Sequence, residues 1–194
     1  MTTTRDRAKA DRRAALLTAA ARLFAQRGFE RVSLEELGAA VGVSAPAIYR
    51  HFPGKQAVLA AILVDASEGL LDGGRAVVSS GADPLAVLRE LVAFHLDFAV
   101  ARPDVIRVQD RDLDSLADED RHRVRMLQRR YVELWVDVLG RIHPALERAE
   151  LLTRAHAAFG LMNSTPYSAG RAGATATRRV LEPMTLAALQ AAAS

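Results

Sequence analysis

The sequence predicts an all-α protein, in which a small helical DNA-binding unit (residues 1–54) precedes a larger helical bundle (residues 55–194). Ala, Leu and Arg dominate the composition, and these residues lose little free energy on entering a helix. No segment alternates apolar and polar residues as a half-buried strand does. Half of the 194 residues are apolar, which is enough to bury a substantial core.

The first two helices are marked by their ends. Apolar residues recur three and four apart over about 10–27, and Gly28 then ends this helix. Ser33 is followed three positions later by Glu36, the pattern of a capping box, in which each residue satisfies a backbone N–H near the other. A second, short helix is therefore expected over about 34–41.

A turn and a third short helix complete a helix-turn-helix pattern over 32–55. Gly42 can adopt the positive φ that a tight turn needs. Ser44 is expected to cap the next helix, which carries Pro46 in its first turn, where the missing N–H has no intrahelical partner to lose. In such a pair the second helix enters the DNA major groove. The pattern alone is unspecific, because many helical proteins contain two short helices joined by a glycine.

The rest of the chain is predicted as helices separated by loops. Asp72-Gly73-Gly74 is expected to end a helix that begins at Lys55, and the acidic stretch 110–120 and the segment 170–173 are expected to be loops or turns. Pro103 ends another helix, because proline cannot continue one. The expected helices span about 55–71, 83–102, 104–109, 119–142, 146–167 and 174–192.

Charge is divided unevenly along the chain. Residues 1–60 hold ten Lys and Arg against five Asp and Glu, a net charge of +5, whereas residues 61–194 hold sixteen against eighteen, a net charge of −2. A basic N-terminal part on a near-neutral body is typical of a protein that meets a polyanion. The alternative is an arginine-rich segment that is simply solvated.

Several classes of protein are disfavoured. The chain has no Cys, which excludes disulfides and thiolate metal sites. Its longest clear apolar run, 57–64, is too short to span a bilayer, and the basic N-terminus lacks the apolar region of a signal peptide, so a cytoplasmic location without membrane contact is expected. No catalytic constellation, phosphate loop or metal-binding His pair is visible, so neither an enzyme nor a cofactor or metal site is predicted.

Four segments of the N-terminal unit are far more specific than its helix pattern. They resemble the DNA-binding domain of the TetR family over about residues 10–64. The resemblance implies three DNA-binding helices attached to a larger helical domain that dimerises and usually binds a small molecule. The segments are Leu23-Phe-Ala-Gln-Arg-Gly-Phe29, Ser33-Leu-Glu-Glu-Leu-Gly38, Val41-Gly-Val-Ser44 and Ile48-Tyr-Arg-His-Phe-Pro-Gly-Lys55.

The resemblance places the polar ends of Tyr49, His51 and Lys55 on the DNA backbone, where contacts position a protein without reading sequence. Ser33 and Ser44 present hydroxyls at helix N-termini, which suit phosphate oxygens. Ser33 is expected to take this role from its neighbour, because Leu34 stands where the family often has Thr. For Tyr49, a place in the core remains open.

Three residues of the third helix are left to meet base edges. Ala45 and Ala47, a variant of the family's usual small-residue stretch, can touch a thymine methyl, and Arg50 can bind a guanine with two hydrogen bonds. A purely solvated role for Arg50 remains open. Arginines of the N-terminal arm are expected to follow a groove or phosphates. They are Arg5, Arg7, Arg12 and Arg13.

Apolar faces on the later helices are expected to surround a bundle interior, where small-ligand pockets commonly lie. Core packing remains open for most of the candidate residues. His95 can be a satisfied core histidine, and Asn163 can accommodate a kink imposed by Pro166. The expected ligand-binding residues are Val92, His95, Phe98, Gln128, Tyr131, Trp135, Phe159, Met162 and Asn163.

Together these features predict a homodimeric repressor of transcription that binds a palindromic double-stranded DNA operator and is released by a small effector. The effector is expected to be lipophilic or aromatic; an acyl thioester is one option, since Arg102, Arg107 and Arg111 can meet phosphates near a pocket mouth. Its signal is expected to travel through the helix that begins at Lys55, and the last two helices are expected to form the dimer interface. The alternative is a helical scaffold or architectural protein with only non-specific DNA binding.

Overall fold

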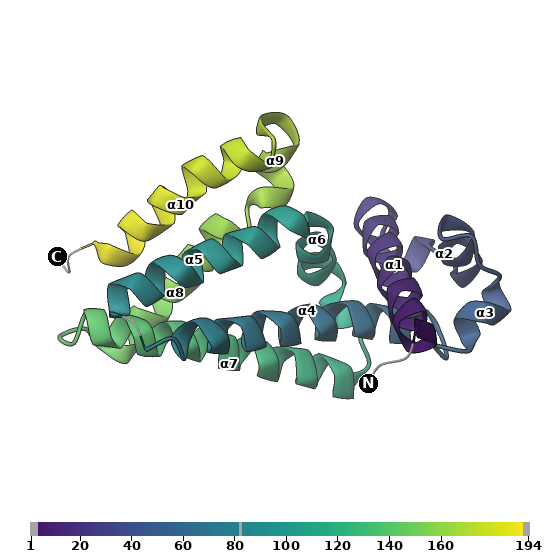
Figure 1. Ribbon diagram of the computed structural model, residues 1–194, viewed down its shortest axis with the longest axis horizontal. Coiled ribbons are helices and arrows are strands. Elements are labelled where there is room, and N and C mark those ends of the chain that lie inside the picture. Colours follow the sequence, from purple (N-terminus) through teal and green to yellow (C-terminus); the bar gives the residue numbers. More distant parts are fainter. Residues whose placement is uncertain (1–3, 82, 192–194) are drawn as a thin grey trace.

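The computed structural model describes residues 4–81 and 83–191, and all the regular structure in these ranges is helical (Figure 1). The all-α prediction is therefore confirmed. No helix in this part of the chain is long and apolar enough to cross a membrane. The helices are α1 (Thr4–Arg27), α2 (Leu34–Ala40), α3 (Ala45–Tyr49), α4 (Lys55–Val78), α5 (Pro84–Ala101), α6 (Pro103–Asp112), α7 (Asp118–Ile142), α8 (Arg148–Met162), α9 (Thr165–Ala172) and α10 (Ala174–Gln190), with short 3₁₀ turns η1 (Phe29–Arg31) and η2 (Leu113–Ser115).

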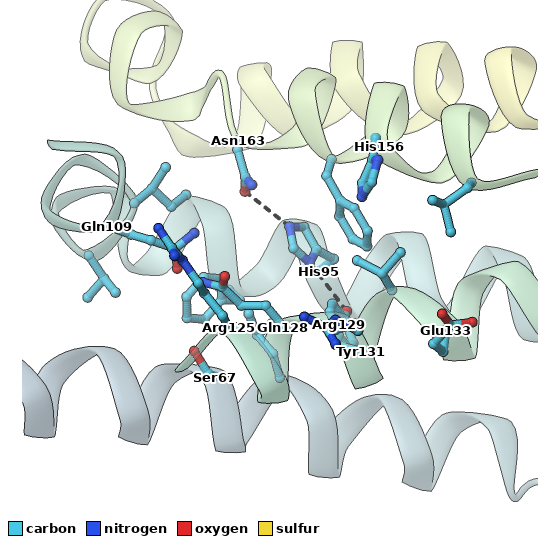
Figure 2. Close-up of a pocket in the computed structure, with 17 residues that line it drawn as sticks. Ser67, His95, Gln109, Arg125, Gln128, Arg129, Tyr131, Glu133, His156 and Asn163 are labelled. Atoms are coloured by element: carbon cyan, nitrogen blue, oxygen red, sulfur yellow. Dashed lines mark hydrogen bonds between the residues drawn. The ribbon is translucent and has the colours of Figure 1, made fainter. Parts of the chain in front are cut away.

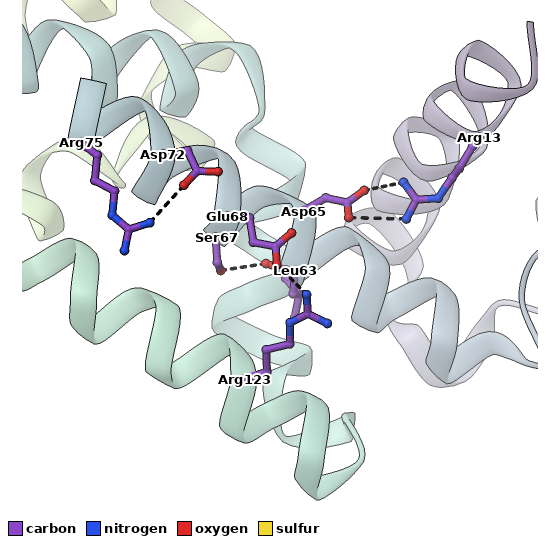
Figure 3. Close-up of polar contacts among 8 residues, drawn as sticks. All are labelled: Arg13, Leu63, Asp65, Ser67, Glu68, Asp72, Arg75 and Arg123. Carbon is purple, nitrogen blue, oxygen red and sulfur yellow. Dashed lines mark hydrogen bonds and ion pairs between the residues drawn. The ribbon is translucent and has the colours of Figure 1, made fainter. Parts of the chain in front are cut away.

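Helices α1, α2 and α3 lie together at one end of the molecule, and α4 runs from them along its length (Figure 1). Helix α7 lies alongside α4, and the two are joined at the surface by an ion pair of 2.6 Å between Arg123 and Glu68 (Figure 3). Helices α5, α8 and α10 complete the bundle. One helix thus connects the N-terminal unit to the bundle without a break.

The three N-terminal helices are held together by buried apolar residues, among them Phe24, Leu37 and Ile48. The capping box of α2 is formed as predicted: Glu36 donates its backbone N–H to Ser33 Oγ (3.2 Å), and Ser33 donates its N–H to Glu36 Oε2 (2.8 Å). This second bond, together with Arg27, holds the pKa of Glu36 below its usual value. Helix α1 is longer than predicted and begins at Thr4, so the basic arm is helical.

The break expected at Gly73 and Gly74 does not exist, because α4 continues to Val78. A Cβ on Gly73 would lie 2.1 Å from Cζ of Phe94, and one on Gly74 would lie 2.7 Å from Cε2 of Tyr131. These glycines therefore permit close approach of α5 and α7 to α4. Two adjacent glycines predict a loop from sequence, whereas in the structure they allow neighbouring helices to pack closely.

Three further segments differ from the sequence expectation. The acidic stretch 110–120 is mostly helical, since α6 reaches Asp112 and α7 begins at Asp118, where acidic residues favour a helix N-terminus. The helix expected over 146–167 is divided, because Pro166 lacks an N–H and cannot continue α8; it lies instead in the first turn of α9. The segment expected as a turn, 170–173, is helical up to Ala172.

Candidate functional site

The C-terminal end of α3 presents polar side chains to solvent. Tyr49 is 53% exposed, which rules out a place in the core, and Arg50 and His51 are also exposed. Ile48 and Phe52, on either side, are buried and anchor this turn of chain to the N-terminal core. Anchored backbone with exposed polar ends is the arrangement that a DNA-contacting helix needs.

Ser33, Tyr49 and Lys55 line one shallow surface depression between α2, α3 and the start of α4. Lys55 is only partly available there. Its Nζ donates to the backbone oxygen of Glu30 (3.2 Å) and lies 4.4 Å from the ring centroid of Phe29. The positive end of Lys55 is thus fixed beside Ser33 and Tyr49 instead of extending freely into solvent.

Ser44 occupies the N-cap position of α3, but its side chain makes no capping hydrogen bond, unlike that of Ser33. The expected cap is therefore absent, and the exposed hydroxyl is not engaged at the helix end. The side chains of Ala45, Ala47 and Arg5 lie outside the described part of the structure.

Leu34 and Arg13 have structural roles that separate them from the DNA contacts. Leu34 is buried, which leaves its neighbour Ser33 as the exposed residue at the start of α2. Arg13 donates to Asp65 of α4 (2.7 Å and 3.4 Å), so this arginine of the expected DNA-binding arm ties α1 to α4 (Figure 3).

A cavity of about 590 Å³ lies within the bundle and is lined by α4, α5, α6, α7 and α8 (Figure 2). This volume is typical of small-molecule sites. Arg125, Arg129 and His156 at its edge are exposed, whereas His95 and Tyr131 inside it are buried. Six residues expected to contact a ligand line this cavity: His95, Phe98, Gln128, Tyr131, Phe159 and Asn163.

Buried His95 and Tyr131 form a hydrogen-bonded chain with half-buried Asn163 (Figure 2). His95 Nε2 lies 3.1 Å from Asn163 Oδ1, and Nδ1 lies 3.3 Å from the Tyr131 hydroxyl. Asn163 Oδ1 can only accept, so Nε2 carries the proton and Tyr131 donates to Nδ1. Burial lowers the pKa of His95 to about 4 and raises that of Tyr131, so the chain is neutral at physiological pH.

Three expected ligand contacts lie behind the cavity wall. Val92, Trp135 and Met162 are fully buried and do not line the cavity. The Trp135 ring packs within 6.2 Å, centroid to centroid, of His95 and within 5.0 Å of Phe159. Apolar helix faces are buried where neighbouring helices pack closely, so these three residues contact other helices instead of the cavity. They pack against the lining side chains from behind and hold them in place.

Two protein-family models match the chain in succession. One, described as bacterial regulatory proteins of the tetR family, matches residues 16–62; the other, described as a tetracyclin repressor-like C-terminal domain, matches residues 81–167. The first covers the helix-turn-helix, and the second covers α5 to α8 and part of α9. The chain belongs to the TetR family of transcriptional regulators.

Among curated proteins, this TetR-family chain is 30% identical over 132 residues to the HTH-type transcriptional repressor KstR2 of Rhodococcus jostii (strain RHA1), covering 68% of this chain and 65% of the relative. It is 32% identical over 121 residues to the nucleoid occlusion factor SlmA of Marinomonas sp. (strain MWYL1), covering 62% and 60%. The matches thus span less than two thirds of these relatives. Among solved structures, a TetR-family transcriptional regulator from Bordetella parapertussis 12822 has a TM-score of 0.80 at 25% identity, covering 91% of this chain and 93% of that one.

Several residues at the cavity of this TetR-family protein were missed from sequence. Arg125, Arg129 and Val132 share a face of α7 with Gln128, so helical spacing alone would have found them. Arg102, Arg107 and Arg111, the arginines expected near the mouth, do not line the cavity. Arg107 donates to the backbone oxygen of Pro166. Other lining residues come from α4, α6 and α8 and depend on tertiary packing: Ser67, Leu70, Val105, Ile106, Gln109, Leu152 and His156.

Proposed function

We propose that this protein is a ligand-responsive repressor that binds a palindromic operator as a homodimer. Residues 1–54 hold the DNA, and residues 55–194 hold the effector and the partner subunit. The observation that carries the proposal is the continuous helix α4, which joins a helix-turn-helix with exposed polar side chains to a bundle that encloses a cavity of about 590 Å³. The Rhodococcus relative is itself described as a transcriptional repressor, which supports repression over activation.

The proposed DNA contacts divide into positioning and reading groups. Exposed Tyr49 and His51, the hydroxyl of Ser44, and the group formed by Ser33 and Lys55 bind phosphates and fix the register of α3 on the duplex.

Base edges are left to α3 itself. Arg50, which is exposed, can bind a guanine with two hydrogen bonds, and Ala45 and Ala47 meet the bases beside it. The net charge of +5 on residues 1–60 adds an attraction to DNA that is independent of sequence and falls with salt.

The proposed dimer is supported by an apolar strip on α10. Val180 and Met184 are four residues apart, so they lie on one face, and they are 52% and 49% exposed. The exposed small residues Ala187 and Ala188 continue this part of the helix and permit close helix approach. A two-fold interface made from the same strip on both subunits would present two copies of α3 to a palindrome.

Helix α4 provides one route from the cavity to the DNA-binding unit. Ser67 and Leu70 line the cavity, and the same helix begins at Lys55, beside the helix-turn-helix. The Arg13–Asp65 ion pair fastens α1 to the middle of this helix (Figure 3). An occupant that displaces α4 therefore displaces α1 as well.

Helix α6 provides a second route. Gln109 lines the cavity, while Arg111, two residues later, donates to the backbone oxygens of Phe24 and Ala25 at the end of α1 and pairs with Asp112. A coupling of about 1–3 kcal/mol between the two sites would weaken DNA binding roughly 5- to 150-fold. Such a coupling needs only a small shift of either helix.

The proposal is tested by fluorescence anisotropy with labelled DNA from the region flanking the protein's own gene, at physiological salt and with excess competitor DNA. Saturable binding that survives the competitor, with a stoichiometry of two chains per site, is the expected result. Binding that disappears with the competitor would argue against a sequence-specific repressor.

A second candidate function is supported by the similarity to a nucleoid occlusion factor. An architectural protein would bind DNA through its basic unit with little regard to sequence. In the same assay, its affinity would be equal for the flanking DNA and for scrambled DNA, and it would fall steeply with salt.

A further inference from the structure

The cavity contains two kinds of polar side chain. Both ring nitrogens of His95 are paired, one with the Tyr131 hydroxyl and the other with Asn163 Oδ1. Gln128 differs, because its Nε2 is buried and has no hydrogen-bond partner within residues 4–81 and 83–191. Buried donors are almost always paired, since an unpaired donor has lost its water without replacement. Gln128 lines the cavity through its other atoms, so its amide is an unpaired donor directly behind the cavity surface, and a rotation of the side chain would turn it toward a ligand.

Positive charge lies beside this donor. Arg125, Gln128 and Arg129 line the cavity at spacings of three and four along α7, so they occupy one face of the helix (Figure 2). Arg125 is paired with Asp114 at 3.2 Å. Arg129 forms no ion pair with any residue that the structure describes, and the nearest lining carboxylate along α7, Glu133, is paired with Arg148.

The remainder of the cavity is mainly apolar and is formed by residues from five helices. A polar group at the α7 edge, combined with apolar walls, matches a molecule that has one charged end and one apolar body. The apolar lining residues include Leu70, Phe98, Val105, Ile106, Val132 and Phe159.

We propose that the effector is an amphipathic carboxylic acid, with its carboxylate on Arg129 and, after a rotation of the side chain, on Gln128 Nε2, and with its apolar body against Phe98, Ile106 and Phe159. A carboxylate is an acceptor-only group that can receive both an arginine and an amide donor. An alcohol of the same shape supplies no charge for the arginine. This inference rests on the cavity being the effector site.

The single tryptophan provides the readout. Trp135 is the only Trp in the chain, and its ring lies 6.2 Å from Tyr131 and 5.0 Å from Phe159, both of which line the cavity. Its emission is titrated, without DNA, with decanoate and with decanol, and then with phenylbutyrate and phenylbutanol, all below their aggregation limits. Decanoyl coenzyme A is a further probe, because it carries phosphates in place of a free carboxylate.

At least one acid is expected to bind about tenfold or more tightly than its matched alcohol. The variant Arg129→Gln should remove this preference and leave alcohol binding unchanged, and Gln128→Leu should reduce it. Arg130→Gln is the matched control, because Arg130 is exposed and does not line the cavity. It should retain the full preference.

Equal binding of acid and alcohol, or no binding of either acid, would overturn the inference. So would an unchanged preference in Arg129→Gln, or binding of decanoyl coenzyme A alone, which would assign the anion site to phosphate. DNA anisotropy on the same preparation separates this failure from failure of the repressor proposal, because operator binding without an effector does not depend on the cavity's ligand.

Discussion

The DNA-binding end and the cavity end of this molecule use polar side chains in opposite ways. At the end of α3, Tyr49 and His51 are exposed, and their backbone is fixed by buried neighbours. In the cavity, His95 and Tyr131 are buried and satisfy each other. Changes at the first end should therefore affect binding and leave stability unchanged, whereas changes at the second should affect stability first.

The largest expected effect on stability is at Trp135, which is fully buried against His95 and Phe159. Trp135→Ala should lower the free energy of unfolding by about 3–5 kcal/mol, because it removes a large side chain and leaves a cavity. Urea denaturation measures the loss. A loss below about 1 kcal/mol would contradict the burial of Trp135 behind the cavity wall.

His95 should make stability depend on pH. Its pKa is lowered to about 4 by burial, from an ordinary value of 6.5, so between these values the unfolded chain binds a proton that the folded chain does not. The contribution of neutral His95 to the free energy of unfolding is therefore complete above pH 6.5. It falls by roughly 3 kcal/mol as the pH is lowered toward 4.

Urea denaturation over this pH range measures the His95 effect as the difference between wild type and His95→Gln. The variant His156→Gln is the control, since His156 is exposed at the same cavity. Parallel pH curves for wild type and His95→Gln would contradict a buried, neutral His95.

Two glycines of α4 provide a smaller contrast within one helix. Gly74→Ala should destabilise the fold by about 1–3 kcal/mol, because its Cβ would lie 2.7 Å from the Tyr131 ring. Gly69→Ala should stabilise it by about 0.5–1 kcal/mol, because nothing lies within 4 Å and alanine favours helix. Thermal denaturation of the two variants should show a lower unfolding temperature for Gly74→Ala and a higher one for Gly69→Ala. Stabilisation by both would mean that α4 and α7 are not in close contact.

The two ends also differ in how far the sequence predicts them. Around Ser33 and Tyr49 the information is local: a capping box, a glycine turn and a motif predict the helices, whereas the exposure of Tyr49 is decided only by the structure. Gly73 and Gly74 show the limit of local reasoning. Glycine weakens an isolated helix, but here the absence of a side chain lets another helix approach, and only the tertiary structure reveals this.

The cavity depends on which helix faces meet. His95 and Asn163 were predicted from their polarity within apolar stretches, and the structure brings them together across 68 residues of chain. Trp135 also lies on an apolar helix face, yet it is buried behind the cavity wall. Helical periodicity shows which face of a helix is buried, but it does not show which residues of that face line the cavity. Arg111 contacts α1 across 87 residues, a pairing that no local signal contains.

The most direct test of the account measures operator affinity and thermal stability on the same preparations of wild type and Tyr49→Ala. Tyr49→Ala is expected to lower affinity for the flanking DNA about tenfold or more, because a phosphate contact is lost, and to leave the unfolding temperature unchanged, because Tyr49 is exposed. Wild-type affinity in Tyr49→Ala, or a large fall in its unfolding temperature, would contradict the assignment of this surface to DNA.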